Sequence, residues 1–403
     1  VKKPEGYTTA KVDQIIQEYE KKSANTQQST AKQYPNIITV VNETFADIKV
    51  LGDFKTNEDY MPYFHSLKKN CVTGYTYASI VGGQTANTEF ELLTGNTLGF
   101  LSAGTTAFQL YIHGQMPSLV SNLKAEGYSG NKAMHPFNPY NYNRPAVYKD
   151  FGFTDFIDKF DFPKNVKRVR EYISDEANVD RIISEYEKNR KKTDQPFYMY
   201  NMTIQNHSPY DKDAANFKQP IKIESSKYDA EANRYLNLIK YSDDSLKQLT
   251  SYFEKCKEPT IILFLGDHQP RLTDEFMNKI TNGQYQTWSS EQMMKRYQVP
   301  FVIWANYDIK EQHIEKTSMN YMQSILTQTA GVKMTGYQRF LNEVRKDVTT
   351  ITSQGYWGNN GKFYQINDKG SPYYGIIQKY RMIQYNMMFD KKNRRDSFFE
   401  ASK

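Results

Sequence analysis

The sequence predicts an α/β fold, in which a mostly parallel central sheet is flanked by helices and followed by a small C-terminal antiparallel subdomain. Short apolar runs rich in β-branched residues recur along the chain with helical patterns between them, which is typical of a parallel sheet covered on both faces. After Val332 this alternation ends, and the chain becomes rich in Tyr, Gly, Asn and Lys. A length of 403 residues is sufficient for one large domain with a small appendage.

The N-terminal segment, residues 1–33, is predicted to be a short amphipathic helix followed by a linker. The helix is indicated by four apolar residues with the spacing of one helix face: Val12, Ile15, Ile16 and Tyr19. Residues 22–33 are rich in Ser, Thr, Gln and Lys, a composition typical of a linker.

Residues 34–330 are predicted to form the main domain. Four apolar runs are predicted to be its buried strands: 36–41, 197–203, 260–265 and 299–304. Two intervening helices are indicated by apolar residues at helical spacing, Val179, Ile182, Ile183 and Tyr186 in one and Ile239, Leu246, Leu249 and Phe253 in the other.

Residues 331–403 are predicted to form the antiparallel subdomain, because short patches such as 361–366 alternate between apolar and polar residues. Residues 391–395 form a basic run near the end of the chain. Such a run is typical of a solvated terminus, and contact with a membrane is the alternative.

Charge and composition narrow the class of protein. Lys and Arg number 52 against 45 Asp and Glu, and the net charge of +7 with no interleaved basic and aromatic stretch does not indicate nucleic-acid binding. This small excess suits an enzyme that works beside anionic lipid or phosphate polymer, or it serves solubility alone. Cys71 and Cys256 belong to no zinc or C-x-x-C pattern, and sequence cannot decide whether they pair.

The sequence contains no run near the roughly 20 apolar residues that a membrane helix needs. It also begins with Val rather than Met. We interpret it as a processed or excised fragment, with any membrane anchor lying upstream of it.

Polar side chains follow two of the predicted strands, where an open α/β sheet binds its ligands. Glu43 follows the strand at 36–41, and Asp267 and His268 follow the strand at 260–265. Carboxylate and imidazole ligands suit Mn²⁺, Zn²⁺ or Mg²⁺. A turn or a satisfied hydrogen-bonding group is the alternative reading of each residue.

A glycine-rich turn precedes a third candidate residue. Gly82 and Gly83 are followed by Thr85, which is expected to begin a helix. A hydroxyl in this position is most often a helix cap, but the free N–H groups of a helix N-terminus also favour an anion. A metal-activated hydroxyl attacks phosphorus, which makes Thr85 a candidate nucleophile. Thr88 competes for this role, although its place inside the helix makes it less exposed.

Further candidates come from loops. His207 follows the strand at 197–203 and is a candidate for proton transfer. His135, Tyr142, Asn143 and Arg144 are candidates for lining the same pocket, and a guanidinium binds phosphate in a bidentate way. Each alone is more typical of an ordinary structural or surface residue. Together with the other candidates, they favour metal-assisted phosphoryl transfer through a covalent threonine intermediate.

These motifs resemble those of the lipoteichoic acid synthases, which are membrane-anchored members of the alkaline phosphatase and sulfatase superfamily. The resemblance covers residues 35–330 and rests on five segments in the family's order: Asn42-Glu43-Thr44-Phe45, Gly82-Gly83-Gln84-Thr85-Ala86-Asn87-Thr88-Glu89-Phe90, Asn143-Arg144, Asn206-His207 and Gly266-Asp267-His268. The segment around Thr85 is most similar to that of relatives that decorate streptococcal rhamnose polysaccharides with glycerol phosphate. Residues 84–88 lack the C-x-P-x-R pattern of sulfatases, so sulfate ester hydrolysis is not expected.

The resemblance implies a site and a reaction. It implies one metal ion, commonly Mn²⁺, held by Glu43, Thr85, Asp267 and His268, with Thr85 as the nucleophile. It also implies that Arg144, His207 and His135 contact the phosphoglycerol group. Tyr142 stands where these synthases carry Trp, which leaves its role open.

The implied reaction moves sn-glycerol 1-phosphate from phosphatidylglycerol to a cell-surface polysaccharide or a growing glycerol phosphate polymer, at the outer face of a Gram-positive cell membrane. The alternatives are lipoteichoic acid polymer synthesis, a phosphodiesterase or phosphoethanolamine transferase with the same site, and a non-catalytic polysaccharide-binding module suggested by the 32 tyrosines.

Overall fold

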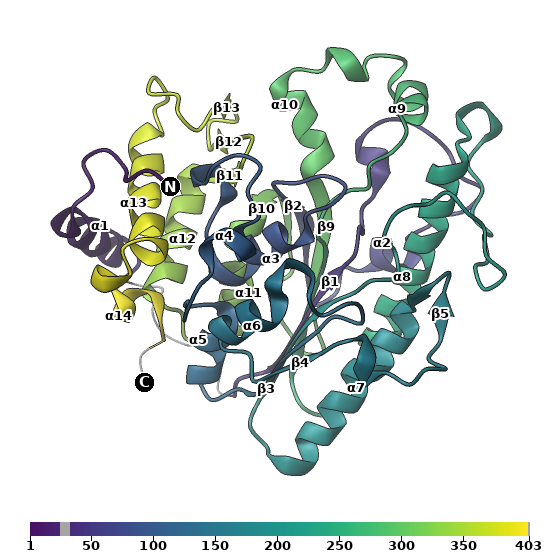
Figure 1. Ribbon diagram of the computed structural model, residues 1–403, viewed down its shortest axis with the longest axis horizontal. Coiled ribbons are helices and arrows are strands. Elements are labelled where there is room, and N and C mark those ends of the chain that lie inside the picture. The colour runs from purple at the N-terminus through teal and green to yellow at the C-terminus, as the bar shows by residue number, and fades with distance from the viewer. Residues whose placement is uncertain (25–32, 402–403) are drawn as a thin grey trace.

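The computed structural model describes residues 1–24 and 33–401 (Figure 1). In this part of the chain the central sheet has eight strands, in the order β10-β2-β9-β8-β1-β7-β3-β4. In chain order they are β1 (Asn36–Asn42), β2 (Cys71–Tyr77), β3 (Ser129–Met134), β4 (Asp155–Ile157), β7 (Phe197–Met202), β8 (Thr260–Gly266), β9 (Gln298–Ala305) and β10 (Gln312–Ser318). The predicted α/β class and all four predicted strands are confirmed.

Strand β9 differs from its neighbours in direction. It runs antiparallel to both β2 and β8, whereas the other neighbouring pairs of the sheet are parallel. The N-terminal end of β9 therefore lies at the same edge as the carboxyl end of β8. The sequence of β9 is a continuous apolar run like that of β8, since both strands are buried on both faces. This pattern is the same for either strand direction.

Helices cover both faces of the sheet (Figure 1). Successive residues of β1 point to opposite faces: Ile37 and Val41 join one hydrophobic cluster, and Ile38 and Val40 join another. The helices are α1 (Thr9–Lys22), α2 (Pro62–Ser66), α3 (Thr85–Thr94), α4 (Ala107–Tyr111), α5 (Leu119–Ala125), α6 (Arg144–Phe151), α7 (Asp175–Lys192), α8 (Ala230–Glu254), α9 (Asp274–Thr281), α10 (Ser290–Met293), α11 (Met322–Ala330), α12 (Gly336–Asp347), α13 (Tyr374–Met388) and α14 (Asp396–Phe399).

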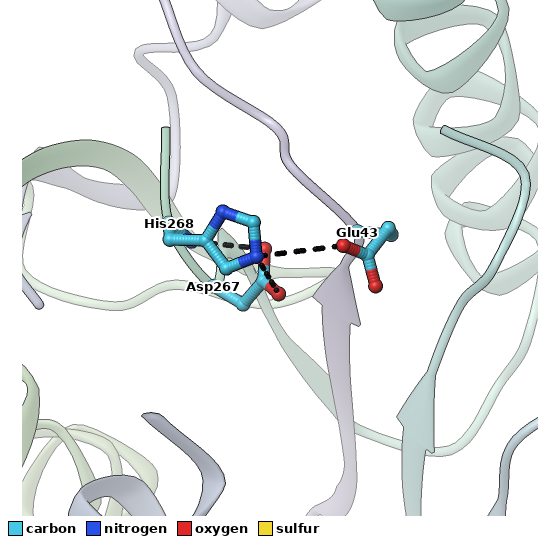
Figure 2. Close-up of side chains that lie close together, drawn as sticks. All are labelled: Glu43, Asp267 and His268. Carbon is cyan, nitrogen blue, oxygen red and sulfur yellow. Dashed lines mark hydrogen bonds and ion pairs between the residues drawn. The ribbon is translucent and has the colours of Figure 1, made fainter. Parts of the chain in front are cut away.

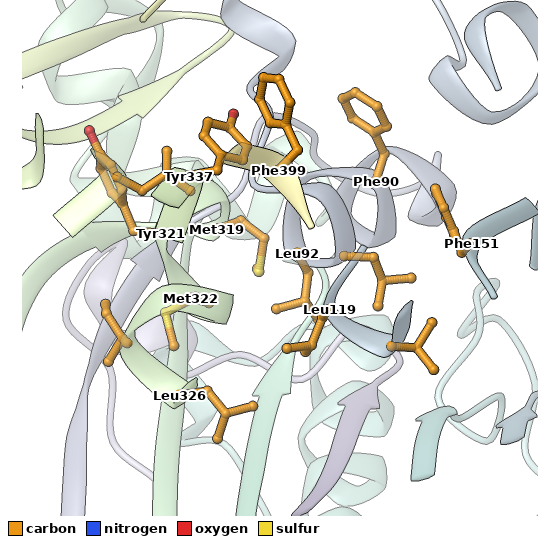
Figure 3. Close-up of a cluster of buried hydrophobic side chains, with 14 of the residues drawn as sticks. Phe90, Leu92, Leu119, Phe151, Met319, Tyr321, Met322, Leu326, Tyr337 and Phe399 are labelled. Atoms are coloured by element: carbon orange, nitrogen blue, oxygen red, sulfur yellow. The ribbon is translucent and has the colours of Figure 1, made fainter. Parts of the chain in front are cut away.

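One hydrophobic cluster joins the central sheet to the C-terminal region. Figure 3 shows Leu92 of α3 and Met322 of α11 beside Tyr337 of α12. The C-terminal region also contains the predicted antiparallel sheet, formed in the described residues by β11 (Val348–Thr352), β12 (Gly355–Gly358) and β13 (Phe363–Tyr364). A two-stranded hairpin lies elsewhere, with β5 (Arg168–Val169) and β6 (Tyr172–Ile173). The domain boundary at residue 330 stays a prediction, and the core continues across it.

The two ends of the chain pack together. The predicted N-terminal helix is confirmed as α1, with Val12, Ile15 and Tyr19 buried, and the Tyr19 ring meets Phe340 of α12 edge to face at 4.5 Å. Arg395 pairs with Asp13 through two contacts of 2.7 and 3.1 Å. Most of the predicted linker at 22–33 lies outside the described residues.

Two sequence questions have direct answers. Cys71 and Cys256 are both free, so they do not form a disulfide. Within the described residues no helix has the length and apolar character to cross a membrane.

Candidate metal centre and catalytic cavity

Three buried side chains from two strand ends meet at the carboxyl edge of the sheet (Figure 2). Strands β1 and β8 are parallel neighbours with Asn42 opposite Gly266, so Glu43 and Asp267 follow at the same level. One ligand atom from each of Glu43, Asp267 and His268 lies within 4.8 Å of the others. The predicted convergence of these three residues is therefore present.

The local backbone brings the two strand ends unusually close. A Cβ at Gly266 would lie 1.8 Å from the carbonyl oxygen of Phe45, so only glycine allows this approach. Thr44 adopts a left-handed conformation with φ of 55°, which is uncommon for a β-branched residue. In that conformation the Thr44 backbone N–H donates to Asp267 Oδ1 at 2.7 Å, and its hydroxyl donates to Glu43 Oε1 at 2.9 Å. The strained residue thus joins both carboxylates.

The His268 ring is oriented by its backbone partner. Nδ1 lies 2.8 Å from the carbonyl oxygen of Gln269, which can only accept, so Nδ1 carries a proton. Nε2 is 3.1 Å from Asp267 Oδ2 and 3.5 Å from Glu43 Oε1, and it is buried with no hydrogen-bond partner in the described part of the chain. A histidine oriented through Nδ1–H with its other nitrogen directed at two carboxylates is the usual arrangement of a metal ligand.

The electrostatics of the cluster also fit a cation. Burial and the neighbouring Asp267 raise the pKa of Glu43 to about 8. Burial lowers the pKa of His268, but Asp267 and Glu43 outweigh it and raise this pKa to about 9. Burial also disfavours the charged form of Asp267, but His268 and hydrogen bonds hold its pKa below the usual value. Protons on Glu43 and His268 thus balance negative charge that a divalent ion would otherwise balance. The oxygen and nitrogen donors of this group suit Mn²⁺, Zn²⁺ or Mg²⁺.

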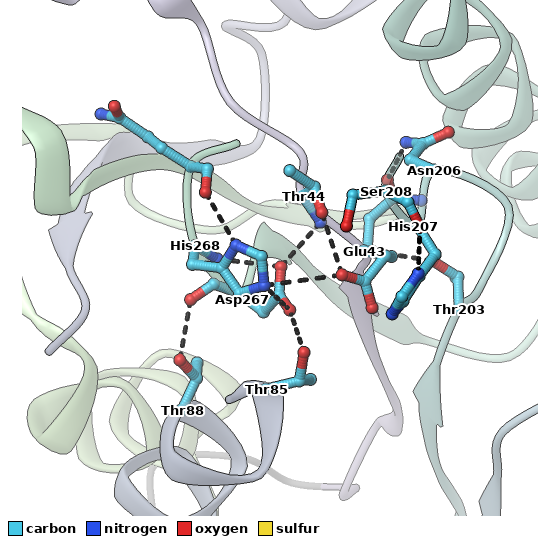
Figure 4. Close-up of polar contacts among 12 residues, drawn as sticks. Glu43, Thr44, Thr85, Thr88, Thr203, Asn206, His207, Ser208, Asp267 and His268 are labelled. Atoms are coloured by element: carbon cyan, nitrogen blue, oxygen red, sulfur yellow. Dashed lines mark hydrogen bonds and ion pairs between the residues drawn. The ribbon is translucent and has the colours of Figure 1, made fainter. Parts of the chain in front are cut away.

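Thr85 lies at the first position of α3, directed at the same carboxylate. Gln84, with φ of 59°, turns the chain into the helix. The Thr85 hydroxyl donates to Asp267 Oδ2 at 2.8 Å (Figure 4). Thr88 points to the same strand end, but its hydroxyl donates to the Asp267 carbonyl oxygen at 2.8 Å and is fully buried. The geometry therefore favours Thr85 over Thr88 as the reactive hydroxyl.

A cavity of about 360 Å³ opens over this group. Its lining includes most of the predicted site residues: Glu43, Thr85, His135, Tyr142, Arg144, His207 and His268. Asn143 does not line it, and Asn141 does. The reason is the left-handed backbone at both Tyr142 and Asn143, which turns the chain through the short helical turn η4 (Asn141–Asn143).

Two histidines of the cavity differ in environment. His135 is buried, with Nδ1 2.8 Å from the Met202 carbonyl oxygen, and burial together with Arg144 lowers its pKa well below the usual value. It is therefore neutral and holds its Nδ1 proton. His207 is exposed, with Nδ1 2.6 Å from the Ser208 carbonyl oxygen and its ring stacked on Phe137. This contact leaves Nε2 of a neutral His207 as a proton acceptor.

Arg144 is held by the buried carboxylate of Glu89, a residue to which the sequence alone assigned no role. Its Nη2 and Nε donate to Glu89 Oε2 at 2.8 and 3.2 Å, and both side chains are almost fully buried. Glu89 Oε1 accepts hydrogen bonds from Tyr148 and from Tyr200, the latter at 2.8 Å. The sequence contains one indication of this buried carboxylate. Glu89 is a charged residue one turn after Thr85, on a helix whose other residues before Glu91 are apolar or neutral.

Tyr142 completes the surroundings of Arg144. The Arg144 guanidinium carbon lies 5.2 Å from the centre of the Tyr142 ring, within cation–π range. One edge of the guanidinium is engaged by Glu89 and one face by Tyr142, and Arg144 still lines the cavity. The arrangement leaves a fixed cation beside the space that faces Thr85.

Comparison with known proteins identifies the family of the chain. A family model described as Sulfatase matches residues 35–332. A putative cyclic beta-1,2-glucan modification protein of Rhizobium meliloti is 30% identical over 381 residues, covering 93% of this chain and 58% of that protein. The chain spans between 35% and 58% of the length of the first three curated relatives it matches.

Two solved structures share the fold. The Streptococcus pyogenes phosphoglycerol transferase GacH, in complex with sn-glycerol-1-phosphate, has a TM-score of 0.79 at 20% identity, covering 100% of this chain and 99% of that one. The lipoteichoic acid synthase LtaP from Listeria monocytogenes has a TM-score of 0.66 at 18% identity, covering 94% and 98%. The chain belongs to the sulfatase family, and within it is similar to the lipoteichoic acid synthases.

Proposed function

We propose that this chain is the catalytic domain of a phosphoglycerol transferase. It moves sn-glycerol 1-phosphate from phosphatidylglycerol to a hydroxyl of a cell-surface polysaccharide or glucan, at the outer face of a cell membrane. The observation that carries the proposal is the Thr85 hydroxyl, 2.8 Å from Asp267 Oδ2 and inside a group of Glu43, Asp267 and His268 that can hold a cation. Support comes from the family match, from the glycerol phosphate complex of the structurally similar transferase, and from the similarity to the putative cyclic beta-1,2-glucan modification protein.

Glu43, Asp267, His268 and Thr85 would hold one Mn²⁺, with Zn²⁺ and Mg²⁺ as the alternatives. When bound, such an ion lowers the pKa of a coordinated hydroxyl and offsets charge on phosphoryl oxygens. The chain's own residues supply the rest. Arg144, fixed by Glu89, balances the negative charge of the phosphodiester, and neutral His135 directs Nε2 at the same space.

The reaction has two displacements at phosphorus. In the first, Thr85 Oγ passes its proton to Asp267 Oδ2, the bond from Thr85 Oγ to phosphorus forms, and the bond to the diacylglycerol oxygen breaks, while His207, protonated at Nε2, gives that proton to the leaving oxygen. In the second, the acceptor oxygen bonds to phosphorus, the Thr85 bond breaks, His207 Nε2 takes the acceptor proton, and Asp267 returns the first proton to Thr85. His207 is placed for this exchange because it is exposed at the cavity rim.

The test uses the chain with Mn²⁺ and vesicles of phosphatidylglycerol labelled in the glycerol headgroup. We expect diacylglycerol release, and a Thr85-containing peptide whose mass increases by one glycerophosphoryl group. Vesicles of phosphatidylethanolamine form the second arm, because faster turnover of that lipid would replace the proposal with a phosphoethanolamine transferase. No turnover of either lipid, with the metal bound, would contradict the proposed function.

A further inference from the structure

A second cavity of about 1030 Å³ adjoins the catalytic cavity. The two share six lining residues, so they meet along this border: Gly82, Gly83, Gln84, Ser208, Tyr210 and Arg271. We call this second cavity the lateral groove. It has two long walls, one formed by residues 79–84 after β2 and the other by residues of the β8–β9 connection, 267–297.

The sheet topology explains why both walls stand over the catalytic edge. Strand β2 ends at Tyr77, which pairs with Gln298 at the start of antiparallel β9. The β8–β9 connection therefore leaves and returns at the carboxyl edge of the sheet, with α10 above β2 and β9 and α9 farther to the right, above α2 and α8 (Figure 1). One end of the groove thus borders the loop that precedes Thr85.

The lining of the lateral groove combines aromatic faces with planar charged groups. The Arg296 guanidinium lies 5.5 Å from the centre of the Tyr285 ring, and Nη1 donates to the Tyr285 hydroxyl at 3.4 Å. Tyr297 lies nearby, and Glu231 and Asp274 add carboxylates. Aromatic faces suit the apolar faces of sugar rings, and planar polar groups suit their hydroxyls. Acyl chains would instead desolvate these charges at a cost.

Arg271 stands where the two cavities meet. A Cβ at Gly82 would lie 3.0 Å from the Cβ of Arg271, so the absence of a side chain at Gly82 lets Arg271 pack over the turn before Thr85. Arg271 is exposed, and among the described residues it makes no hydrogen bond or ion pair. Its donors are therefore available to a molecule that spans the border between the cavities.

We propose that the lateral groove binds the acceptor as a carbohydrate chain and directs its terminal hydroxyl past Arg271 to the phosphorus on Thr85. This inference rests on the proposed function and names the place and chemical class of the second substrate. In-line displacement requires the acceptor oxygen to enter opposite Thr85 Oγ, from the side through which the first leaving group departed. The acceptor O–P bond then forms, the Thr85 O–P bond breaks, the acceptor proton passes to His207, and Asp267 returns a proton to Thr85 Oγ.

A binding experiment tests the groove without turnover. The Thr85→Ala chain with Mn²⁺ is titrated by calorimetry with a neutral gluco-oligosaccharide and, separately, with a glycerol phosphate oligomer. We expect the oligosaccharide to bind, and Tyr285→Ala or Arg296→Ala to weaken binding at least tenfold. The matched control is Tyr252→Ala, near the end of α8 at the opposite edge of the sheet. Binding of the glycerol phosphate oligomer alone, or unchanged oligosaccharide binding in both groove variants, would overturn the proposal.

Turnover separates this proposal from the function it rests on. In chains with Thr85 intact and without acceptor, Tyr285→Ala and Arg296→Ala are expected to release the first equivalent of diacylglycerol at the parent rate, because the first displacement does not use the groove. With acceptor present, the KM for the oligosaccharide is expected to rise at least tenfold. An unchanged acceptor KM would overturn the groove assignment. If the parent chain releases no diacylglycerol, the proposed function fails, and the calorimetric result still decides whether the groove binds carbohydrate.

Discussion

Thr85 and Asp267 lie 182 positions apart in the chain and are joined by a hydrogen bond of 2.8 Å from the threonine hydroxyl to the aspartate Oδ2. The contact depends on two backbone features. One is the left-handed conformation of Gln84, just before α3, and the other is the parallel pairing of β1 with β8, which sets Asp267 beside Glu43. A helix cap would direct its hydroxyl at the backbone N–H groups of its own helix, and Thr85 directs its hydroxyl at a distant carboxylate instead.

Replacing Thr85 by Ala is expected to lower diacylglycerol release by a factor on the order of 10³ or more, because the attacking oxygen is lost. Thr85→Ser should keep part of the activity. Thr88→Val is the control: it should cost about 1 kcal/mol of stability for its lost hydrogen bond and keep turnover within a few-fold. Steady-state kinetics and urea unfolding measure both effects, and undiminished release by Thr85→Ala would remove this residue from the mechanism.

Addition of Mn²⁺ is expected to raise the melting temperature of the chain, and a chelator should reverse the rise. An ion at a hundred times its Kd stabilises the folded state by about 2.7 kcal/mol. Asp267→Asn should abolish the rise, because one of the three converging ligands is lost. Asp243→Asn is the matched control, since Asp243 is buried on α8 and accepts from the Tyr63 and Phe64 N–H groups. An equal rise in both variants would place the ion elsewhere.

Glu89→Gln is expected to destabilise the chain by about 3–5 kcal/mol, because the change leaves the Arg144 guanidinium buried without its counter-charge. The KM for phosphatidylglycerol should rise as well, since Arg144 loses its fixed orientation. Tyr148→Phe removes one hydrogen bond to Glu89 and keeps the charge pair, so it should cost only about 1 kcal/mol. Urea unfolding with donor kinetics would contradict this account if the two variants behaved alike.

His65 gives the stability of the chain a pH dependence through its contacts with Asp47 and Asp59. Its hydrogen bond with Asp47 raises its pKa to about 9, against the opposing effect of burial and with further help from Asp59. Because the pKa of His65 in the folded chain lies above its usual value of 6.5, the stabilisation is complete below that pH and is lost as pH rises through about 9.

His65→Gln should therefore lower the free energy of unfolding by about 1 kcal/mol at pH 6 and by close to nothing at pH 10. The effect at pH 6 is small because the His65 side chain is 42% exposed, so solvent screens its charge. Urea unfolding at the two values of pH measures the difference. A cost that grew with pH would contradict the charge pairing of His65.

Gly266→Ala is expected to cost more than about 3 kcal/mol and to abolish the stabilisation by Mn²⁺. A methyl group at 1.8 Å from the Phe45 carbonyl would force the ends of β1 and β8 apart and separate Glu43 from Asp267. Gly375→Ala in α13 meets no atom within 4 Å and should be neutral or stabilise by up to about 1 kcal/mol. Thermal unfolding with and without Mn²⁺ distinguishes local strain from a general intolerance of alanine.

The buried strands and the carboxyl-edge residues were predictable because their signals are local. A continuous apolar run such as 260–265 identifies a strand, and the Gly-Asp-His that follows it identifies polar side chains at the carboxyl end of that strand. The direction of β9 was not predictable, because a strand buried on both faces reads alike in either direction. Strands β2, β3, β4 and β10 were not predicted; in β3, for example, Ser129, Gly130 and Lys132 give the strand little apolar character.

The convergence of Glu43, Asp267 and His268 was predictable from the sequence, whereas the residues that surround and support them were less so. Asn143 was expected in the cavity and lies outside its lining, because left-handed residues turn the chain there. Glu89 was overlooked because its partners Arg144, Tyr148 and Tyr200 come from elements distant in sequence, and only the folded chain brings them to one carboxylate.

The reversed direction of β9 has a consequence for how such proteins diverge. Since the excursion from Asp267 to Tyr297 starts and finishes on one rim of the sheet, its length and composition can change without altering the register of any strand. Asp267 and His268, the candidate metal ligands, are its first two residues, so a change farther along the connection leaves them at the end of β8. Evolution, or an engineer, can thus reshape the lateral groove while Thr85 and Asp267 stay in contact.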